Sequence, residues 1–413
     1  MIRTAIFKSE AFRSTFASFK YPNYRLWFVG QLISLVGTWV QSTAQGYLIY
    51  ELTKSSAYLG YVGFVGGLPS WIFTLYAGVI ADRVPRRTLL IITQSVMMVL
   101  ALILSVLAFT GLVQPWHILV LAMFLGAANA FDAPARQAFV LEMVEREDLT
   151  NAIALNATMF NSAVVLGPAV GGIAYALLGP GWCFTFNAVT FLAVIIALWL
   201  MRLRPLTPVT HHRVMRDDLR DGLKFVLETR VVRMLIVNVG TLTVLGLGIV
   251  TLLPAWAVDV LGGDATTYGW LQSARGVGAL TGALMIAILG RFNIRGKLWT
   301  YGSFVMPVSI MLFSLVHWLP LALLMLVGVG WGFMMVANTS NALVQSLVPD
   351  HLRGRVMGIY ILIFFGAFPV GSLIAGKLAE YIGDQPTVLF SALLLLAFVL
   401  FVYWRNPDLR SLE

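Results

Sequence analysis

The segment GVIADRVPRR, at residues 78–87, places one acid and three arginines within six positions, between two long apolar stretches. Its glycine lies four residues before the acid, so both lie on one helix face. A glycine there lets a neighbouring helix approach the carboxylate, which can pair with arginine or cap a helix N-terminus. The pattern indicates a latch that holds one conformation, formed by Gly78, Asp82, Arg83, Arg86 and Arg87.

Asp132 and Arg136 are one helical turn apart within another apolar region. A charged side chain inside a membrane span costs about 2.5–3.5 kcal/mol on insertion scales, so it needs a partner or a function. Asp132 is the one carboxylate that we place clearly inside a span rather than at its mouth. It can serve as a proton-titrating group. The alternative is an internal ion pair with Arg136, linked to Arg86.

Arg275 interrupts an otherwise uncharged stretch at 265–290. A guanidinium stays protonated in proteins, so this side chain must find an oxygen partner near mid-membrane. The nearest acids in the sequence, Asp259 and Asp264, lie toward the mouth of the span. Two interpretations stay open: contact with an anionic or oxygen-rich ligand, or a structural ion pair.

Uncharged polar residues inside other spans predict a polar cavity, although some will only bond helices together. The first span carries Gln31, Thr38, Gln41, Ser42 and Gln45 but no acid. The expected cavity residues are Gln31, Gln41, Gln45, Asn129, Asn161, Asn238, Arg275, Trp331 and Asn338.

Glycine and proline gather at positions that predict close helix crossings. In the fifth span, Pro168 removes a backbone donor and can kink the helix, while its neighbouring glycines allow close contact. We expect a gating helix there, marked by Gly167, Pro168, Gly171 and Gly172. Its expected partner is the eighth span, with Gly276, Gly278 and Gly282. A second crossing is expected between the second span (Gly63, Gly66, Gly67, Pro69) and the eleventh (Gly366, Pro369, Gly371, Gly376).

The elements that carry these residues are membrane spans. Of the 413 residues, 59% are apolar and only 11% are charged, whereas soluble domains carry about a quarter charged residues. A helical span needs about 20 apolar residues. The charge-free stretches, with the double-length ones divided at turn signals, predict twelve transmembrane helices. The fold class is an all-α polytopic membrane protein.

The net charge of +9 indicates orientation and not a nucleic-acid partner. If the N-terminus is cytoplasmic, 25 of the 28 lysines and arginines fall on the cytoplasmic side, and only Lys54, Arg275 and Lys377 do not. That distribution follows the positive-inside rule and places both termini in the cytoplasm. The first residues lack the apolar stretch and cleavage site of a signal peptide. Cys183 is the only cysteine, which excludes an intrachain disulfide.

A polar stretch at 202–233 divides the chain into two sets of six spans, 1–201 and 234–413. Its apolar residues recur at helical spacing and predict an amphipathic linker helix on the cytoplasmic surface, with Met215, Leu219, Leu223, Val226 and Leu227 on one face. The two sets resemble each other weakly, as in ARQAFVLEMV (135–144) and TSNALVQSLV (339–348). Duplicated halves with a site between them are typical of secondary transporters.

Enzymatic and ATP-driven functions find no support. All five histidines fall in loops or at span ends, and there is no G-x-S-x-G or H-E-x-x-H motif. The nearest phosphate-loop candidate, GRFNIRGKL, has the wrong glycine spacing. A channel is disfavoured by the two-fold repeat together with the latch.

GVIADRVPRR resembles the G-x-x-x-D-R-x-G-R-R loop between the second and third helices of the major facilitator superfamily, with Pro85 where glycine is usual. In that family the loop helps to hold the outward-open state through contacts with the eleventh helix. A narrower resemblance, covering roughly 20–200, includes NYRLWFVGQLIS, FDAPARQAFVLEMV and GPAVGG. These segments are similar to the enterobactin-exporter branch, which includes macrolide and multidrug exporters. GPAVGG also resembles part of the fifth-helix motif of antiporters.

The resemblance implies two six-helix bundles related by a pseudo-two-fold axis. It implies export of a bulky, amphipathic or oxygen-rich small molecule, siderophore- or drug-like, by alternating access and proton-coupled antiport. No cofactor is expected, because the proton gradient supplies the energy. We expect a monomer in the bacterial cytoplasmic membrane. The alternative is a lipid or lysolipid transporter of the same fold without proton coupling.

Overall fold

The computed structural model describes residues 16–202, 215–289 and 294–406. Within these ranges, the side chains at positions 74, 75, 78, 79, 81, 82 and 215–219 lie outside the described part. The described residues form helices and turns, without a β-strand. The first set of long helices comprises α2 (Pro22–Thr53), α3 (Ser56–Arg83), α4 (Arg86–Phe109), α5 (Pro115–Phe139), α6 (Leu149–Leu178) and α7 (Pro180–Leu200). Short helices η1 (Ala17–Lys20), η2 (Val140–Glu142) and η3 (Arg146–Asp148) lie beside them.

The second set follows the linker helix α8 (Met215–Glu228). Its first span, Arg230–Val260, is continuous but changes its winding along the way. The segments of that span are α9 (Arg230–Thr241), the π-helical η4 (Leu242–Leu247), the 3₁₀ segment η5 (Gly248–Leu252), α10 (Leu253–Ala255) and the π-helical η6 (Trp256–Val260). Next come α11 (Ala265–Leu289), α12 (Arg295–Leu315), α13 (Leu319–Leu347), α14 (Asp350–Ile382) and α15 (Asp384–Arg405).

Ten of the described helical spans are long and apolar enough to cross a membrane by length and composition alone. Helices α2 and α3, with 32 and 28 residues, bring the long helical spans in the described ranges to the twelve that the sequence predicts. Helix α2 is less apolar than the others because glutamine, threonine and serine occupy one of its faces. The predicted all-α polytopic fold is confirmed.

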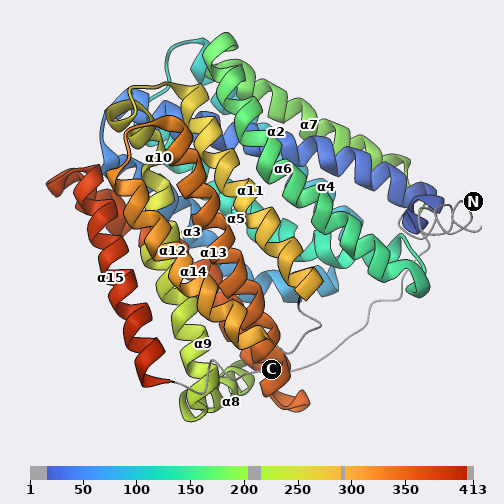
Figure 1. Ribbon diagram of the computed structural model, residues 1–413. Coiled ribbons are helices and arrows are strands. Elements are labelled where there is room, and N and C mark those ends of the chain that lie inside the picture. Colours follow the sequence, from blue (N-terminus) through green and yellow to red (C-terminus); the bar gives the residue numbers. More distant parts are fainter. Residues whose placement is uncertain (1–15, 203–214, 290–293, 407–413) are drawn as a thin grey trace, which may run out of the picture.

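The two sets of helices meet at one end and diverge at the other, giving a V shape (Figure 1). The end where they meet, here called the closed end, contains the turns after Thr53 and Val260 and the turn at Gly383. The opposite, open end contains the start of α2, the linker helix α8 and the end of α15. Between the sets, the main packing pairs are α3 with α14 and α6 with α11.

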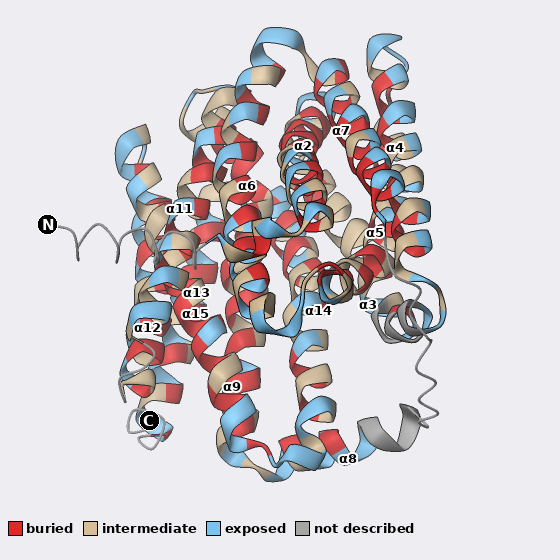
Figure 2. Cartoon of the chain, turned by 90° about the vertical axis from the view of Figure 1, so that its right-hand side faces the viewer, coloured by how far each residue is buried: buried red, intermediate tan, exposed pale blue. Residues whose placement is uncertain are grey.

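Buried residues lie mainly on helix faces that look toward the inside, and the outer faces are largely exposed (Figure 2). Those outer faces are apolar: Leu177, Trp199 and Trp404 expose 76%, 68% and 79% of their surface. Contiguous apolar surface on this scale is unfavourable in water and favourable in a bilayer. The outer surface of the molecule is therefore suited to contact with lipid.

The linker helix α8 lies at the open end, where it packs against α14. The carboxylate of Asp221 pairs with the guanidinium of Arg355 at 2.8 Å, and Val226 is buried. Leu223 and Leu227 remain about half exposed, so the apolar face is only partly covered. Met215 and Leu219, also expected on that face, have side chains outside the described residues.

Candidate functional site

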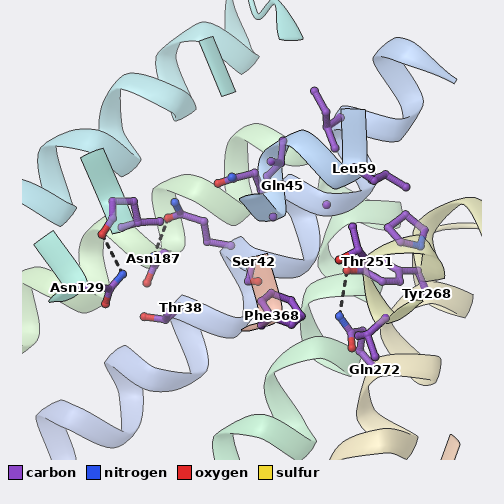
Figure 3. A pocket seen from close by; sticks show the side chains of 18 of the residues that line it. Thr38, Ser42, Gln45, Leu59, Asn129, Asn187, Thr251, Tyr268, Gln272 and Phe368 are labelled. Carbon is purple, nitrogen blue, oxygen red and sulfur yellow. Dashed lines mark hydrogen bonds between the residues drawn. The ribbon is translucent and has the colours of Figure 1, made fainter. Parts of the chain in front are cut away.

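A cavity of about 320 Å³ lies between the two sets of helices (Figure 3). Both sets contribute to its wall. The first set supplies Thr38, Gln41, Ser42, Gln45, Gly46, Ile49, Leu59, Val62, Gly63, Met97, Leu125, Asn129, Asn187 and Phe191. The second set supplies Val250, Thr251, Pro254, Tyr268, Gln272 and Phe368.

Helix α2 supplies the polar floor of the cavity because its polar residues recur at helical spacing. Thr38, Gln41, Ser42 and Gln45 are three or four residues apart along the chain, which brings them onto one face. None of the residues lining the cavity carries a formal charge. The cavity thus offers hydrogen bonds and apolar surface to a ligand, without an ion-pair partner.

The side chains in the wall are linked in hydrogen-bonded chains. Asn187 Nδ2 donates to Gln41 Oε1 at 2.6 Å, and Thr251 Oγ1 donates to Ser372 Oγ at 2.8 Å. On α11, Gln272 Nε2 donates to the Tyr268 hydroxyl at 3.1 Å. These bonds hold the side chains in defined orientations, so the wall is pre-organised before a ligand arrives.

A hydrogen-bonded seal closes the cavity at the closed end. The hydroxyl of Ser56 donates to Asp384 Oδ1 at 2.6 Å, and that of Ser55 donates to Glu380 Oε2 at 2.7 Å. The Tyr50 hydroxyl donates to the carboxylate of Asp259. In each pair the first set of helices provides the donor and the second provides the carboxylate. These three pairs, which we call the outer seal, join the two sets.

Backbones come close beside the outer seal. A Cβ on Gly60 would lie 3.0 Å from the Gly376 Cα, so α3 and α14 touch without intervening side chains. A Cβ on Gly172 would lie 2.4 Å from the Ala265 carbonyl oxygen and 3.1 Å from the Gly269 Cα. Small residues permit such close crossings. The predicted crossings of the fifth with the eighth helix and of the second with the eleventh are both present.

Some of these glycines contact a different helix from the one that the sequence predicted. Gly172 and the carbonyl oxygen of Pro168 face α11, whereas Gly167 and Gly171 pack on α2 against Trp39 and Val40. Gly276 packs on Val164 of α6, but Gly278 and Gly282 pack on α13. A row of glycines predicts a close crossing without specifying which neighbouring helix fills each groove.

A family model described as transmembrane secretion effector matches residues 13–412 of the chain. The chain belongs to this family of the major facilitator superfamily. It is 29% identical to the multidrug efflux pump Tap of Mycolicibacterium fortuitum, over 91% of this chain and 94% of that protein. It is 23% identical to the staphyloferrin A transporter of Staphylococcus aureus (94% and 97% covered) and 22% identical to macrolide efflux protein A of Streptococcus pyogenes (95% and 99%).

The fold agrees with this membership. The crystal structure of the nucleoside transporter NupG matches with a TM-score of 0.72 at 14% identity, covering 92% of this chain and 99% of that one. At that identity the likeness shows the fold alone. The protein is a multi-pass membrane transporter of small molecules and not an enzyme.

Asp132 is buried in the first bundle, with only 1% of its surface exposed. Its Oδ1 accepts hydrogen bonds from Thr93 Oγ1 at 2.8 Å and Gln94 Nε2 at 2.9 Å. Its Oδ2 has Arg136 Nε at 3.6 Å and no hydrogen-bond partner among the described residues. The predicted pair with Arg136 is present, and it leaves one carboxylate oxygen incompletely satisfied.

The latch residues of the sequence are only partly described. Gly78 and Asp82 lie on α3, but their side chains fall outside the described residues. Arg83 is exposed, and Arg87 donates to the carbonyl oxygen of Trp199 at 2.9 Å. Arg86 pairs with Glu142 at 3.1 Å, where a link to the Asp132 pair was the expectation.

Three of the nine expected cavity residues line the cavity: Gln41, Gln45 and Asn129. The others lie elsewhere. Gln31 is buried, Asn161 donates to the Ala157 carbonyl, Asn238 donates to Ser303 Oγ, Trp331 is partly buried in α13 and Asn338 is exposed. Arg275 lies one turn from the wall, where its Nε donates to Gln272 Oε1 at 3.2 Å.

Six polar wall residues were not among the expected cavity residues: Thr38, Ser42, Asn187, Thr251, Tyr268 and Gln272. A signal existed for the last two, because Gln272 and Tyr268 precede Arg275 by three and seven residues on the same helix face. A partly buried arginine that cannot lose its proton needs an oxygen on that face. Asn187 and Thr251 gave no comparable signal.

Proposed function

We propose that this protein is a secondary active exporter of bulky, oxygen-rich or amphipathic small molecules, driven by the proton gradient. The main support for this proposal is the cavity between the two sets of helices. Residues of both sets line it, and the outer seal joins the sets at one end only. A site shared between two bodies that seal at one end supports alternating access. The efflux activities in the names of its relatives support the direction of transport.

We propose that residues 1–201 and 234–413 act as the two moving bodies, joined by the linker 202–233. The distribution of lysine and arginine supports placing the open end, with both chain termini, on the cytoplasmic side of the membrane. The V shape then corresponds to an inward-open state of a monomer in the cytoplasmic membrane. In this orientation a substrate enters from the cytoplasm or the inner leaflet.

The proposal is tested in everted membrane vesicles, in which the cytoplasmic face of the protein meets the medium. Candidate macrolides, siderophores and aromatic cations are added singly while substrate uptake and lumenal pH are recorded. We expect uptake of at least one class, together with proton release from the lumen. Uptake that is unaffected when the proton gradient is collapsed would contradict the coupling but not the transport.

A further inference from the structure

Three polar side chains of α11 form a hydrogen-bonded chain that ends at the cavity. Arg275 Nε donates to Gln272 Oε1 at 3.2 Å, and Gln272 Nε2 donates to the Tyr268 hydroxyl oxygen at 3.1 Å. The second of these bonds is visible in Figure 3. Tyr268 and Gln272 line the cavity, whereas Arg275 does not. The chain therefore connects a charge outside the wall to a phenol in the wall.

Arg275 determines which groups donate and which accept in this series of hydrogen bonds. A guanidinium has donors only, so it must face the carbonyl oxygen of the Gln272 amide. The NH₂ group of the same amide must then point toward Tyr268, whose oxygen accepts its hydrogen. The proton of the Tyr268 hydroxyl is left without an acceptor among the described residues. It is free to donate to a ligand.

The geometry places this donor where the two bundles meet across the cavity. Tyr268 is buried, with 5% of its surface exposed, and a Cβ on Gly46 of α2 would lie 2.9 Å from its hydroxyl oxygen. A side chain at position 46 would therefore crowd that oxygen, which glycine does not. A buried donor without an acceptor is costly, which favours a ligand that supplies one.

The opposite wall repeats the arrangement. Asn187 Nδ2 donates to Gln41 Oε1 at 2.6 Å, so the NH₂ group of Gln41 is also left to donate. Acceptors are present too, because Thr38 gives its proton to the Ser34 carbonyl and Asn129 gives one to the Leu125 carbonyl. Each bundle therefore contributes one hydrogen-bond donor, and a hydrogen bond to a neighbouring side chain fixes the orientation of that donor.

We propose that Tyr268 and Gln41 select ligands that carry carbonyl-type or carboxylate oxygens, and that Arg275 is a positioning residue that orients Tyr268 without touching the ligand. This inference rests on the proposed exporter function. It names the substrate class as compounds whose acceptor oxygens reach both bundles. An aromatic cation without oxygen gains nothing from either donor.

The test measures the affinity of the purified full-length protein for two probes. Erythromycin carries ester, ketone and hydroxyl oxygens, whereas ethidium carries none. We expect Tyr268→Phe to weaken erythromycin binding about three- to tenfold, the effect of one hydrogen bond, and to leave ethidium binding unchanged. Gln41→Leu should act in the same direction from the other wall.

A second pair of variants tests the direction of the chain. In Gln272→Glu, a carboxylate cannot donate, so the intact Tyr268 hydroxyl turns its proton toward residue 272. Erythromycin binding should fall as in Tyr268→Phe. Gln45→Glu is the matched control, because it adds the same charge to the wall outside the chain. Arg275→Ala should weaken erythromycin binding, and Arg275→Lys, which again has donors only, should retain part of it.

The inference is overturned if Tyr268→Phe weakens both probes equally or neither, or if Gln272→Glu and Gln45→Glu have the same effect. In each of these outcomes the unmutated protein still binds the probes. Failure of the proposed function would appear differently. The unmutated protein would then take up no macrolide, siderophore or aromatic cation into everted vesicles, and both proposals would fall together.

Discussion

At the scale of single residues, Asp132 is the carboxylate that the sequence predicts as the proton-coupling group, and it is buried in the first bundle. It accepts two hydrogen bonds through Oδ1, while Oδ2 has only a distant guanidinium. We expect Asp132→Asn to keep substrate binding and substrate-for-substrate exchange but to lose uphill transport driven by protons. The amide keeps the size of the side chain and removes its charge. The measurement is uptake into everted vesicles, with and without an imposed pH gradient.

Glu142→Gln is the matched control, since Glu142 pairs with Arg86 at the open end of the same bundle and is also largely buried. It should reduce stability without uncoupling. If Asp132→Asn still concentrates substrate against its gradient, the proton site lies elsewhere and the pair with Arg136 is structural.

At the scale of helices, the crossing of α6 over α11 depends on the absence of one side chain. A Cβ at position 172 would lie 2.4 Å from the Ala265 carbonyl oxygen, closer than real Cβ contacts allow. Gly172→Ala should therefore separate the helices at the closed end and lower the stability of this conformation by about 1–3 kcal/mol, the cost of overpacking. Thermal unfolding of the purified protein measures the loss.

Gly358 of α14 provides the matched control. A Cβ there meets nothing within 4 Å, so Gly358→Ala should be neutral or stabilise its helix by up to about 1 kcal/mol. Equal destabilisation by the two substitutions would show that the α6–α11 contact is not what limits stability.

At the scale of the whole molecule, the outer seal is a hydrogen-bonded contact between two bodies. Ser56→Ala removes the donor to Asp384, and a hydrogen bond to a charged group contributes about 1.5–3 kcal/mol. We expect the population to shift toward the outward-open state by about tenfold or more. The measurement is labelling of a cysteine introduced by Ser42→Cys in the cavity wall, using a membrane-impermeant reagent from the periplasmic side. Replacing the buried Cys183 by alanine first removes the only native thiol.

The latch predicts a shift in the opposite direction. Asp82→Asn should weaken the contact that holds the open end shut in the outward-open state, so inward-open molecules should accumulate and transport should slow. Labelling of the same Ser42→Cys reporter should rise from the cytoplasmic side. Unchanged labelling together with unchanged transport would exclude the latch. Opposite effects of Ser56→Ala and Asp82→Asn are the result expected of a two-state exchange in which the outer seal stabilises one state and the predicted latch the other.

The sequence alone determined the class of molecule, its spans and its helix crossings. The length of an apolar stretch and its lack of charged residues are properties of a single helix, and they determine whether that helix can cross a bilayer. Twelve spans could therefore be predicted without knowing how the helices pack. Glycine rows such as Gly167 to Gly172 likewise predicted close crossings, although they did not specify which neighbouring helix each glycine contacts. The polar residues of α2 likewise predicted that Gln41 and Gln45 line a cavity, as they do.

The packing of the helices determines which polar residues share a cavity and which group Arg275 contacts. An amide at mid-span can line a cavity or bond a neighbouring helix, and both environments satisfy it equally well. Gln41 and Asn238 therefore look alike in the sequence, although one faces the cavity and the other donates to Ser303. Arg275 required an oxygen, but the chain offered carboxylates at a distance and an amide one turn away. The face of α11 that turns toward the first bundle brings Tyr268 and Gln272 to the cavity wall, and packing between helices far apart in the sequence decides which face that is.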